Sequence, residues 1–77
     1  MQTLRVNGPA IRRTRELAGL SVVELVQRMS KAGMNVHPAY LRQLERGDRQ
    51  PSAPCFKVIV RALGCTKEDL LDLEPAA

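Results

Sequence analysis

The segment from His37 to Arg49 concentrates side chains that donate or accept hydrogen bonds. Gln43 carries an amide, which can pair with both N6 and N7 of adenine. Arg46 and Arg49 carry guanidinium groups, whose planar fork matches two oxygens of a phosphate. These residue types suit recognition of a polyanion more than the making or breaking of covalent bonds.

Four further residues extend this set of candidate contacts. Tyr40 and Arg42 have the length to reach base edges or phosphates, and their spacing does not separate the two. His37 is expected to cap a helix or to contact a phosphate. Ser21 begins another helix, and backbone N–H groups at a helix N-terminus attract anions because the helix dipole is positive there. We therefore place Ser21, His37, Arg46 and Arg49 at phosphates.

Catalytic chemistry has little support in the sequence. His37 is the single histidine, so a site with several histidine ligands is excluded. Cys55 and Cys65 lack the close spacing of metal ligands, and we interpret them as reduced, small packing residues. A Ser/His/Asp arrangement and a glycine-rich phosphate loop are also missing. We expect no enzyme activity, no metal and no cofactor.

Positive charge is concentrated in the first two thirds of the chain. The 77 residues include 12 Lys or Arg and 8 Asp or Glu, a net charge of +4. Residues 1–50 carry a net charge of +5 and residues 51–77 a net charge of −1. This asymmetry favours a polyanionic partner. With no signal-peptide pattern and no apolar run of about 20 residues, we expect a cytoplasmic protein without a membrane partner.

Caps and apolar spacing predict four helices and a fifth, short one. The expected ranges are 9–18, 22 to 31 or 32, 38–46, 53–63 and a short stretch after residue 66. Ser21 and Glu24 form a capping box before the second helix, in which each satisfies one unpaired backbone donor. Ser52 is expected to cap the fourth helix, and Thr66 with Asp69 to form a second box.

The apolar periodicity also predicts which side of each helix is buried. The positions expected to face the core are Ile11, Thr14, Ala18, Leu25, Val26, Met29, Leu41, Leu44, Phe56, Ile59, Val60, Leu63, Leu70, Leu71 and Leu73. Tyr40, Arg42, Gln43 and Arg46 should then be largely exposed. We expect an all-α fold, a compact four- to five-helix bundle over residues 8–73. Residues 1–7 should form an arm or short strand, and residues 74–77 a frayed tail.

Several short motifs occur along the chain in an order that is known from one protein family. They are Ile11-x-x-x-Arg15, Gly19-Leu20-Ser21-x-x-Glu24-Leu25, Tyr40-Leu41-x-x-Leu44-Glu45-Arg46-Gly47, Arg49-x-Pro51-Ser52, Ala62-Leu63-Gly64 and Leu70-Leu71. Over residues 8–73 the chain thus resembles the Cro/repressor-like helix-turn-helix family, also called the XRE family. The resemblance implies a transcriptional regulator, by expectation a repressor. It would bind double-stranded DNA sequence-specifically with the helix at residues 38–46 in the major groove.

The resemblance also implies roles for single residues. Arg15 would pair with Glu45 and tie the first helix to the end of the third. Ala39 stands where similar proteins often carry a polar base reader, and its methyl group could contact a thymine methyl. Val22 departs from the glutamine usual in the family, and the segment 29–36 is longer than the family's compact turn. The expected base contacts are thus Ala39, Tyr40, Arg42 and Gln43.

Two partners besides DNA follow from the sequence. One recognition helix reads only a short half-site, so we expect a weak or DNA-induced homodimer. It would form through residues 70–73 or through the N-terminal arm. The alternative to DNA binding is a protein-interaction module on the same scaffold, such as an antitoxin or a partner-binding regulator. It would hold a protein partner on an exposed Val22–Val23 face.

Overall fold

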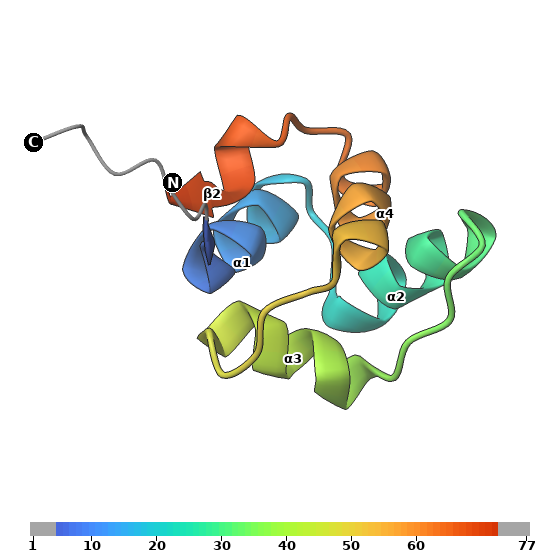
Figure 1. Cartoon of the computed structure of the whole chain (residues 1–77). Coiled ribbons are helices and arrows are strands. Elements are labelled where there is room, and N and C mark those ends of the chain that lie inside the picture. Colours follow the sequence, from blue (N-terminus) through green and yellow to red (C-terminus); the bar gives the residue numbers. More distant parts are fainter. Residues whose placement is uncertain (1–4, 73–77) are drawn as a thin grey trace, which may run out of the picture.

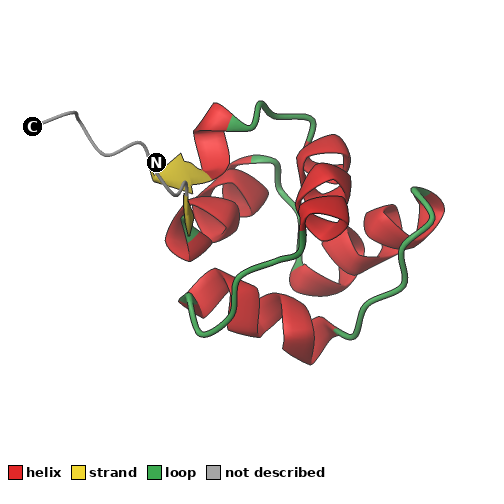
Figure 2. Cartoon of the chain, viewed as in Figure 1, coloured by secondary structure: helices red, strands yellow, loops and turns green. Residues whose placement is uncertain are grey.

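Short helices make up most of the chain between residues 5 and 72, the part that this computed structural model describes (Figure 2). In chain order the elements are β1 (Arg5–Val6), α1 (Gly8–Leu17), α2 (Val22–Lys31), α3 (Pro38–Arg46), α4 (Ala53–Leu63), the 3₁₀ turn η1 (Glu68–Leu70) and β2 (Leu71–Asp72). The predicted all-α fold with four main helices is confirmed, and a two-stranded sheet is added to it.

Each main helix begins at a side chain that accepts a backbone N–H of its first turn. The four caps are Asn7, Ser21, His37 and Ser52. Ser21 and Glu24 form the predicted reciprocal box, with N–H to oxygen distances of 2.9 and 3.1 Å. These bonds satisfy donors that a helix leaves unpaired at its start, which is why the helix boundaries fall close to the predicted ones.

One hydrophobic core joins the four helices and η1. Its buried residues are Ala10, Ile11, Leu20, Leu25, Met29, Leu41, Leu44, Cys55, Ile59, Ala62, Leu63 and Leu70. α3 packs against α1 and α2, and α4 packs against α2. In Figure 1, α3 lies along the lower edge of the molecule. One side of α3 therefore faces the core and the other faces outward.

The start of α1 lies directly against the end of α3. Gly8 is buried, and a Cβ atom there would stand 2.8 Å from the Glu45 carbonyl oxygen and 2.8 Å from the Gly47 nitrogen. It would come closer still to the Leu44 carbonyl oxygen. Because all three are backbone atoms, they cannot move aside unless α3 itself shifts. Glycine at position 8 therefore permits the close contact that positions α3.

The predicted short fifth helix forms only as one 3₁₀ turn. The Asp69 carboxylate does accept the Thr66 N–H at 3.0 Å, as the expected box requires, but only the single turn η1 forms. Leu70 enters the core, and the chain then extends into β2, where Leu71 pairs with Val6. Pairing with a distant strand thus overrides the local helical signal. It also shows that the N-terminal segment enters a strand rather than a free arm at residues 5–6.

The core-facing sides of α1 and α4 differ in part from prediction. Ala18, expected to be buried, follows the last residue of α1 and is exposed. Phe56 and Val60 are half-buried at the edge of the core, whereas Cys55 and Ala62 are buried within it. Cys55 and Ala62 lie four residues before and three residues after Ile59, so the three residues share one side of α4. Leu73 lies outside the described residues.

Candidate nucleic-acid interface

α3 presents a polar side opposite its buried side. The buried residues of α3 are Leu41, Leu44 and Glu45. At 3.6 residues per turn, Ala39, Gln43 and Arg46 fall on the other side, and Ala39 and Arg46 are exposed. Gln43 is half-buried, so the prediction of large exposure is wrong for this residue. The loop after α3 turns back here, and the Asp48 N–H donates to the Gln43 carbonyl oxygen at 3.0 Å.

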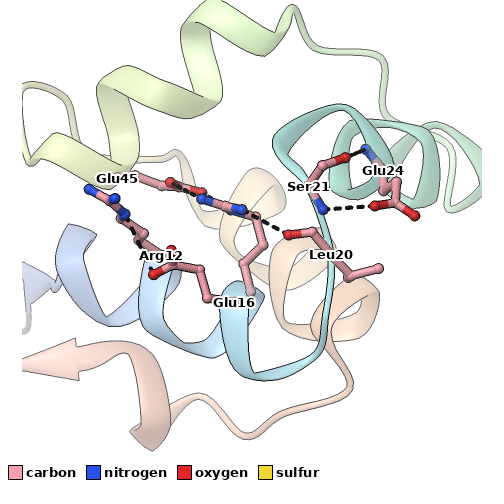
Figure 3. Close-up of polar contacts among 7 residues, drawn as sticks. Arg12, Glu16, Leu20, Ser21, Glu24 and Glu45 are labelled. Atoms are coloured by element: carbon pink, nitrogen blue, oxygen red, sulfur yellow. Dashed lines mark hydrogen bonds and ion pairs between the residues drawn. The ribbon is translucent and has the colours of Figure 1, made fainter.

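A buried ion pair holds α3 on α1. Arg15 Nε lies 2.7 Å from Glu45 Oε2, and Arg15 Nη2 lies 3.0 Å from Glu45 Oε1 (Figure 3). A third donor, Arg15 Nη1, reaches the Leu20 carbonyl oxygen at 2.8 Å. The side chains of Arg15 and Glu45 are only 11% and 5% exposed. Hydrogen bonding to Glu45 raises the pKa of Arg15 against the opposing effect of burial. Both groups of this pair are committed to positioning α3.

Four arginines line one hollow between α1 and α3. Arg12, Arg42 and Arg46 line it together with both members of the Arg15–Glu45 pair. Arg12 lies 3.6 Å from Glu16 (Figure 3), and Arg46 lies 3.0 Å from Asp48, in exposed ion pairs that contribute little energy. Among the described residues of the lining, Glu45 is the only carboxylate, and Arg15 neutralises it. The hollow therefore presents net positive charge beside α3.

The other flank of α3 carries an aromatic contact. Tyr40 is half-buried and packs against the core, whereas we expected it to be largely exposed. The Arg49 guanidinium carbon lies 5.9 Å from the centre of the Tyr40 ring, within the range of a cation–π interaction. Burial raises the pKa of the Cys55 thiol, and a hydrogen bond with Tyr40 opposes that shift. Tyr40 therefore supports Arg49 and the core from one side.

The backbone donors expected near Ser21, at the start of α2, are those of the residues that follow it. The Ser21 N–H is already bonded to Glu24, and these Ser21 bonds lower the pKa of the Glu24 carboxyl, which keeps it charged (Figure 3). At a helix start, the next amides, those of Val22 and Val23, have no intrahelical acceptor. Val22 is half-buried, packs against the core and lines the arginine hollow. The expected exposed Val22–Val23 face is therefore wrong for Val22, while Val23 is 48% exposed.

His37 combines a cap with an exposed position. Its Nδ1 accepts the Ala39 N–H at 3.0 Å, so the ring nitrogen that faces α3 is occupied. In the neutral ring the proton then sits on Nε2, which remains a donor. His37 itself is exposed immediately before α3.

One positioning contact was not predicted from the sequence. The Gln50 side chain accepts the Val6 N–H at 2.9 Å and donates to the Val6 carbonyl oxygen at 3.0 Å. The amide thus bonds to β1 as a third strand would, and it ties the loop that carries Arg49 to the sheet. A glutamine in a loop carries no local signal for such a bond, because its partner is 44 residues away.

Within residues 5–72, no group of three or more His, Cys, Asp or Glu residues is arranged to hold a metal ion. Both cysteines are free thiols in this structure, with Cys55 buried and Cys65 half-buried. Across the same residues, no helix has the length and apolar character needed to span a bilayer.

Comparison with known proteins agrees with this geometry. A family model described as a helix-turn-helix domain matches residues 8–73. Among solved structures, the chain is similar to the clp gene regulator ClgR from C. glutamicum. The two are 32% identical, with a TM-score of 0.69, over 80% of this chain and 74% of that one. None of the curated proteins matches the chain.

Proposed function

The chain belongs to the helix-turn-helix family of the XRE/Cro type, and from this membership we propose that it recognises a specific double-stranded DNA sequence with α3 in the major groove and represses transcription. Membership of this family and similarity to a gene regulator make DNA-binding transcription regulation its function. The sequence specificity, the placement of α3 and the repression are the parts that we propose.

The observation that carries the proposal is the rigid, positively charged surface on and beside α3. The Gly8 contact and the Arg15–Glu45 pair fix α3 on α1. Arg12, Arg42 and Arg46 then gather at one edge of its outward side. A major groove about 12 Å wide admits one helix, and cations along the edges of that helix would meet the flanking phosphates.

Base reading is assigned to the middle of the outward side. Ala39 and Gln43 are one turn apart and lie opposite the buried residues of α3. The Gln43 amide would pair with adenine, and the Ala39 methyl would contact thymine. Arg42 opens onto the hollow at one flank, and Tyr40 packs at the other. We therefore propose that Arg42 contacts a phosphate and that Tyr40 supports α3 by packing, and that neither residue contacts a base.

The phosphate contacts are assigned to both edges of α3. Arg12, Arg42 and Arg46 would bind one strand at the hollow, and Arg49, held on Tyr40, would bind beyond the end of α3. His37 Nε2 would add a donor before α3. Near Ser21 the donors would be the following backbone amides, because the Ser21 N–H is bonded to Glu24. These contacts fix the orientation of α3 but carry no sequence information.

We further propose that two chains bind adjacent half-sites about 34 Å apart, as a weak or DNA-induced homodimer. The contact cannot involve Leu70 as we expected from the sequence, because Leu70 is fully buried in its own chain. Leu71 pairs with Val6 through its backbone, and its side chain is half-buried. Sedimentation of the chain with selected DNA should show two chains per duplex. The selected sequences should contain a repeated half-site.

Selection from a random DNA library, followed by titration of the winning duplex, tests the assignment of α3. Gln43→Ala should weaken binding to that duplex by about 1–3 kcal/mol and relax the preference at one or two base pairs. Gln27→Ala removes the same amide from the exposed surface of α2 and serves as the matched control. Equal weakening on selected and scrambled DNA would show that α3 does not read bases.

Repression is tested separately in a reporter assay. The selected site is placed between promoter elements, and expression is compared with and without the chain. A bound operator that overlaps the promoter should lower expression, and Gln43→Ala should restore it. Increased expression from the same arrangement would refute repression while leaving DNA binding intact.

A further inference from the structure

A second hollow, of about 750 Å³, lies between the small sheet, the loop after α3 and the start of α4. Its apolar lining residues are Val6, Pro51, Ala53, Phe56 and Leu71. No residue of α3 lines it, so it is separate from the face that we assign to DNA. An adjoining hollow on α4 continues this surface with Pro54, Val58 and Val60. We call the two together the α4 groove.

All charged residues that line the α4 groove are cations. Lys57 and Lys67 line both hollows, Arg5 lines the first and Arg61 the second. The lining found within residues 5–72 contains no Asp or Glu. The groove thus combines an apolar floor with cations at its edges, of which Arg5 lies opposite Asp72 across the sheet. An occupant that matches both features needs apolar side chains and carboxylates.

Other occupants match these features less well. DNA would place phosphates at the cations but leaves the apolar floor without a partner. A bilayer surface takes up apolar side chains that project, whereas these line a concavity. A second copy of the chain in a two-fold contact would set the same cations against each other, which is unfavourable.

We propose that the α4 groove binds an acidic peptide segment of a partner protein. Its apolar side chains would fill the hollow beside Phe56 and Leu71, and its carboxylates would lie near Lys57 and Lys67. Exposed ion pairs contribute little affinity, so the apolar side chains supply most of it and the charges supply orientation and selectivity. Because α3 stays free, the partner and DNA can bind one chain together.

A random peptide library displayed on phage and panned on the full chain tests the proposal. Enriched peptides should combine apolar side chains with Asp or Glu. One such peptide is then synthesised and titrated against the chain, Lys57→Glu and Lys31→Glu. Both lysines are exposed, and both substitutions change the net charge equally, but Lys31 lies at the end of α2 outside the groove. Lys57→Glu should weaken peptide binding by about tenfold or more, because repulsion replaces attraction, and Lys31→Glu should change it much less.

Thermal melts establish that both variants fold. In titrations with DNA, the two substitutions should change the affinity for DNA to the same extent. The proposal is overturned if no acidic apolar peptides are enriched, or if Lys31→Glu weakens peptide binding as much as Lys57→Glu. Competition between the peptide and DNA for one site would place the peptide on α3 and also overturn it. Self-association of the chain that Lys57→Glu abolishes would make the groove a contact between copies instead.

Discussion

Removal of the Arg15 guanidinium should leave a buried carboxylate without its partner and destabilise the whole domain. In Arg15→Ala the two bonds to Glu45, at 2.7 and 3.0 Å, and the bond to the Leu20 carbonyl, at 2.8 Å, are all lost. Glu45 remains in place with its side chain 5% exposed in the native protein, and water that enters from the hollow replaces the charged, bidentate donor only in part.

The size of the effect follows from this burial. Removing one partner of a buried ion pair costs about 3–5 kcal/mol. A domain of this length has a free energy of unfolding of roughly 4–12 kcal/mol, at about 0.05–0.15 kcal/mol per residue. Since about 1 kcal/mol shifts the melting temperature of such a domain by about 4–8 °C, Arg15→Ala should lower Tm by at least about 12 °C.

Thermal and urea unfolding followed by circular dichroism measure this change. Arg12→Ala is the matched control, because Arg12 also faces a carboxylate from α1 but in a pair whose side chains are 65% and 56% exposed. It should cost less than about 1 kcal/mol. Arg15→Met combined with Glu45→Leu removes both charges and should recover most of the stability.

Two results would refute the reasoning. If Arg15→Ala has the same Tm as the native protein but binds DNA more weakly, Arg15 is a DNA-contact residue and does not anchor α3. If the double variant is as unstable as Arg15→Ala, the stranded charge of Glu45 is not the cause of the loss.

Three further predictions concern single positions elsewhere in the fold. Gly8→Ala should lower the free energy of unfolding, measured by urea denaturation, by about 1–3 kcal/mol, because the added Cβ meets the backbone of α3. The higher helix propensity of alanine, worth about 1 kcal/mol, does not offset this loss. A variant more stable than the native protein would contradict the close contact. Arg49→Ala should weaken binding to all DNA sequences alike and reduce the slope of log affinity against log salt concentration by about 0.9. Titrations at several salt concentrations measure both effects. A loss of affinity confined to one base pair of the site would contradict a phosphate contact. Because the bonds with Ser21 lower the pKa of Glu24, the contribution of Glu24 to stability is complete above its unfolded pKa and is lost as pH falls through its lower folded pKa. Glu24→Gln should reduce the fall in Tm at acidic pH, as thermal melts across pH would show. An unchanged fall would contradict the cap.

The helices could be predicted because their starts depend on contacts between near neighbours. Ser21 bonds to the N–H of Glu24, and Ser52 bonds to the N–H of Cys55, each three residues later. The buried side of α3 was also predictable, since Leu41 and Leu44 lie three residues apart on one side. Such interactions are complete within one helical turn, so the residue types and their spacing suffice.

The candidate site was predictable only in part. The polar side of α3 follows from its periodicity, but the pairing of Arg15 with Glu45 came from the resemblance to a family. Spacing alone does not bring together two residues 30 positions apart. The gathering of Arg12 with Arg42 at one hollow, and the packing of Tyr40, depend on how α1 and α2 pack against α3.

The sequence by itself therefore determined the helices, their caps and the polar side of α3. Only the tertiary structure decided that β2 replaces a fifth helix, that Gln50 bonds to Val6, and that Asn7 bonds to Asp72 across 65 positions at 2.8 Å. A local signal such as the Thr66–Asp69 box stabilises a turn by one or two hydrogen bonds. Burial of Leu70 and pairing with β1 involve more apolar surface and more hydrogen bonds than that turn, so the contacts between distant segments prevail.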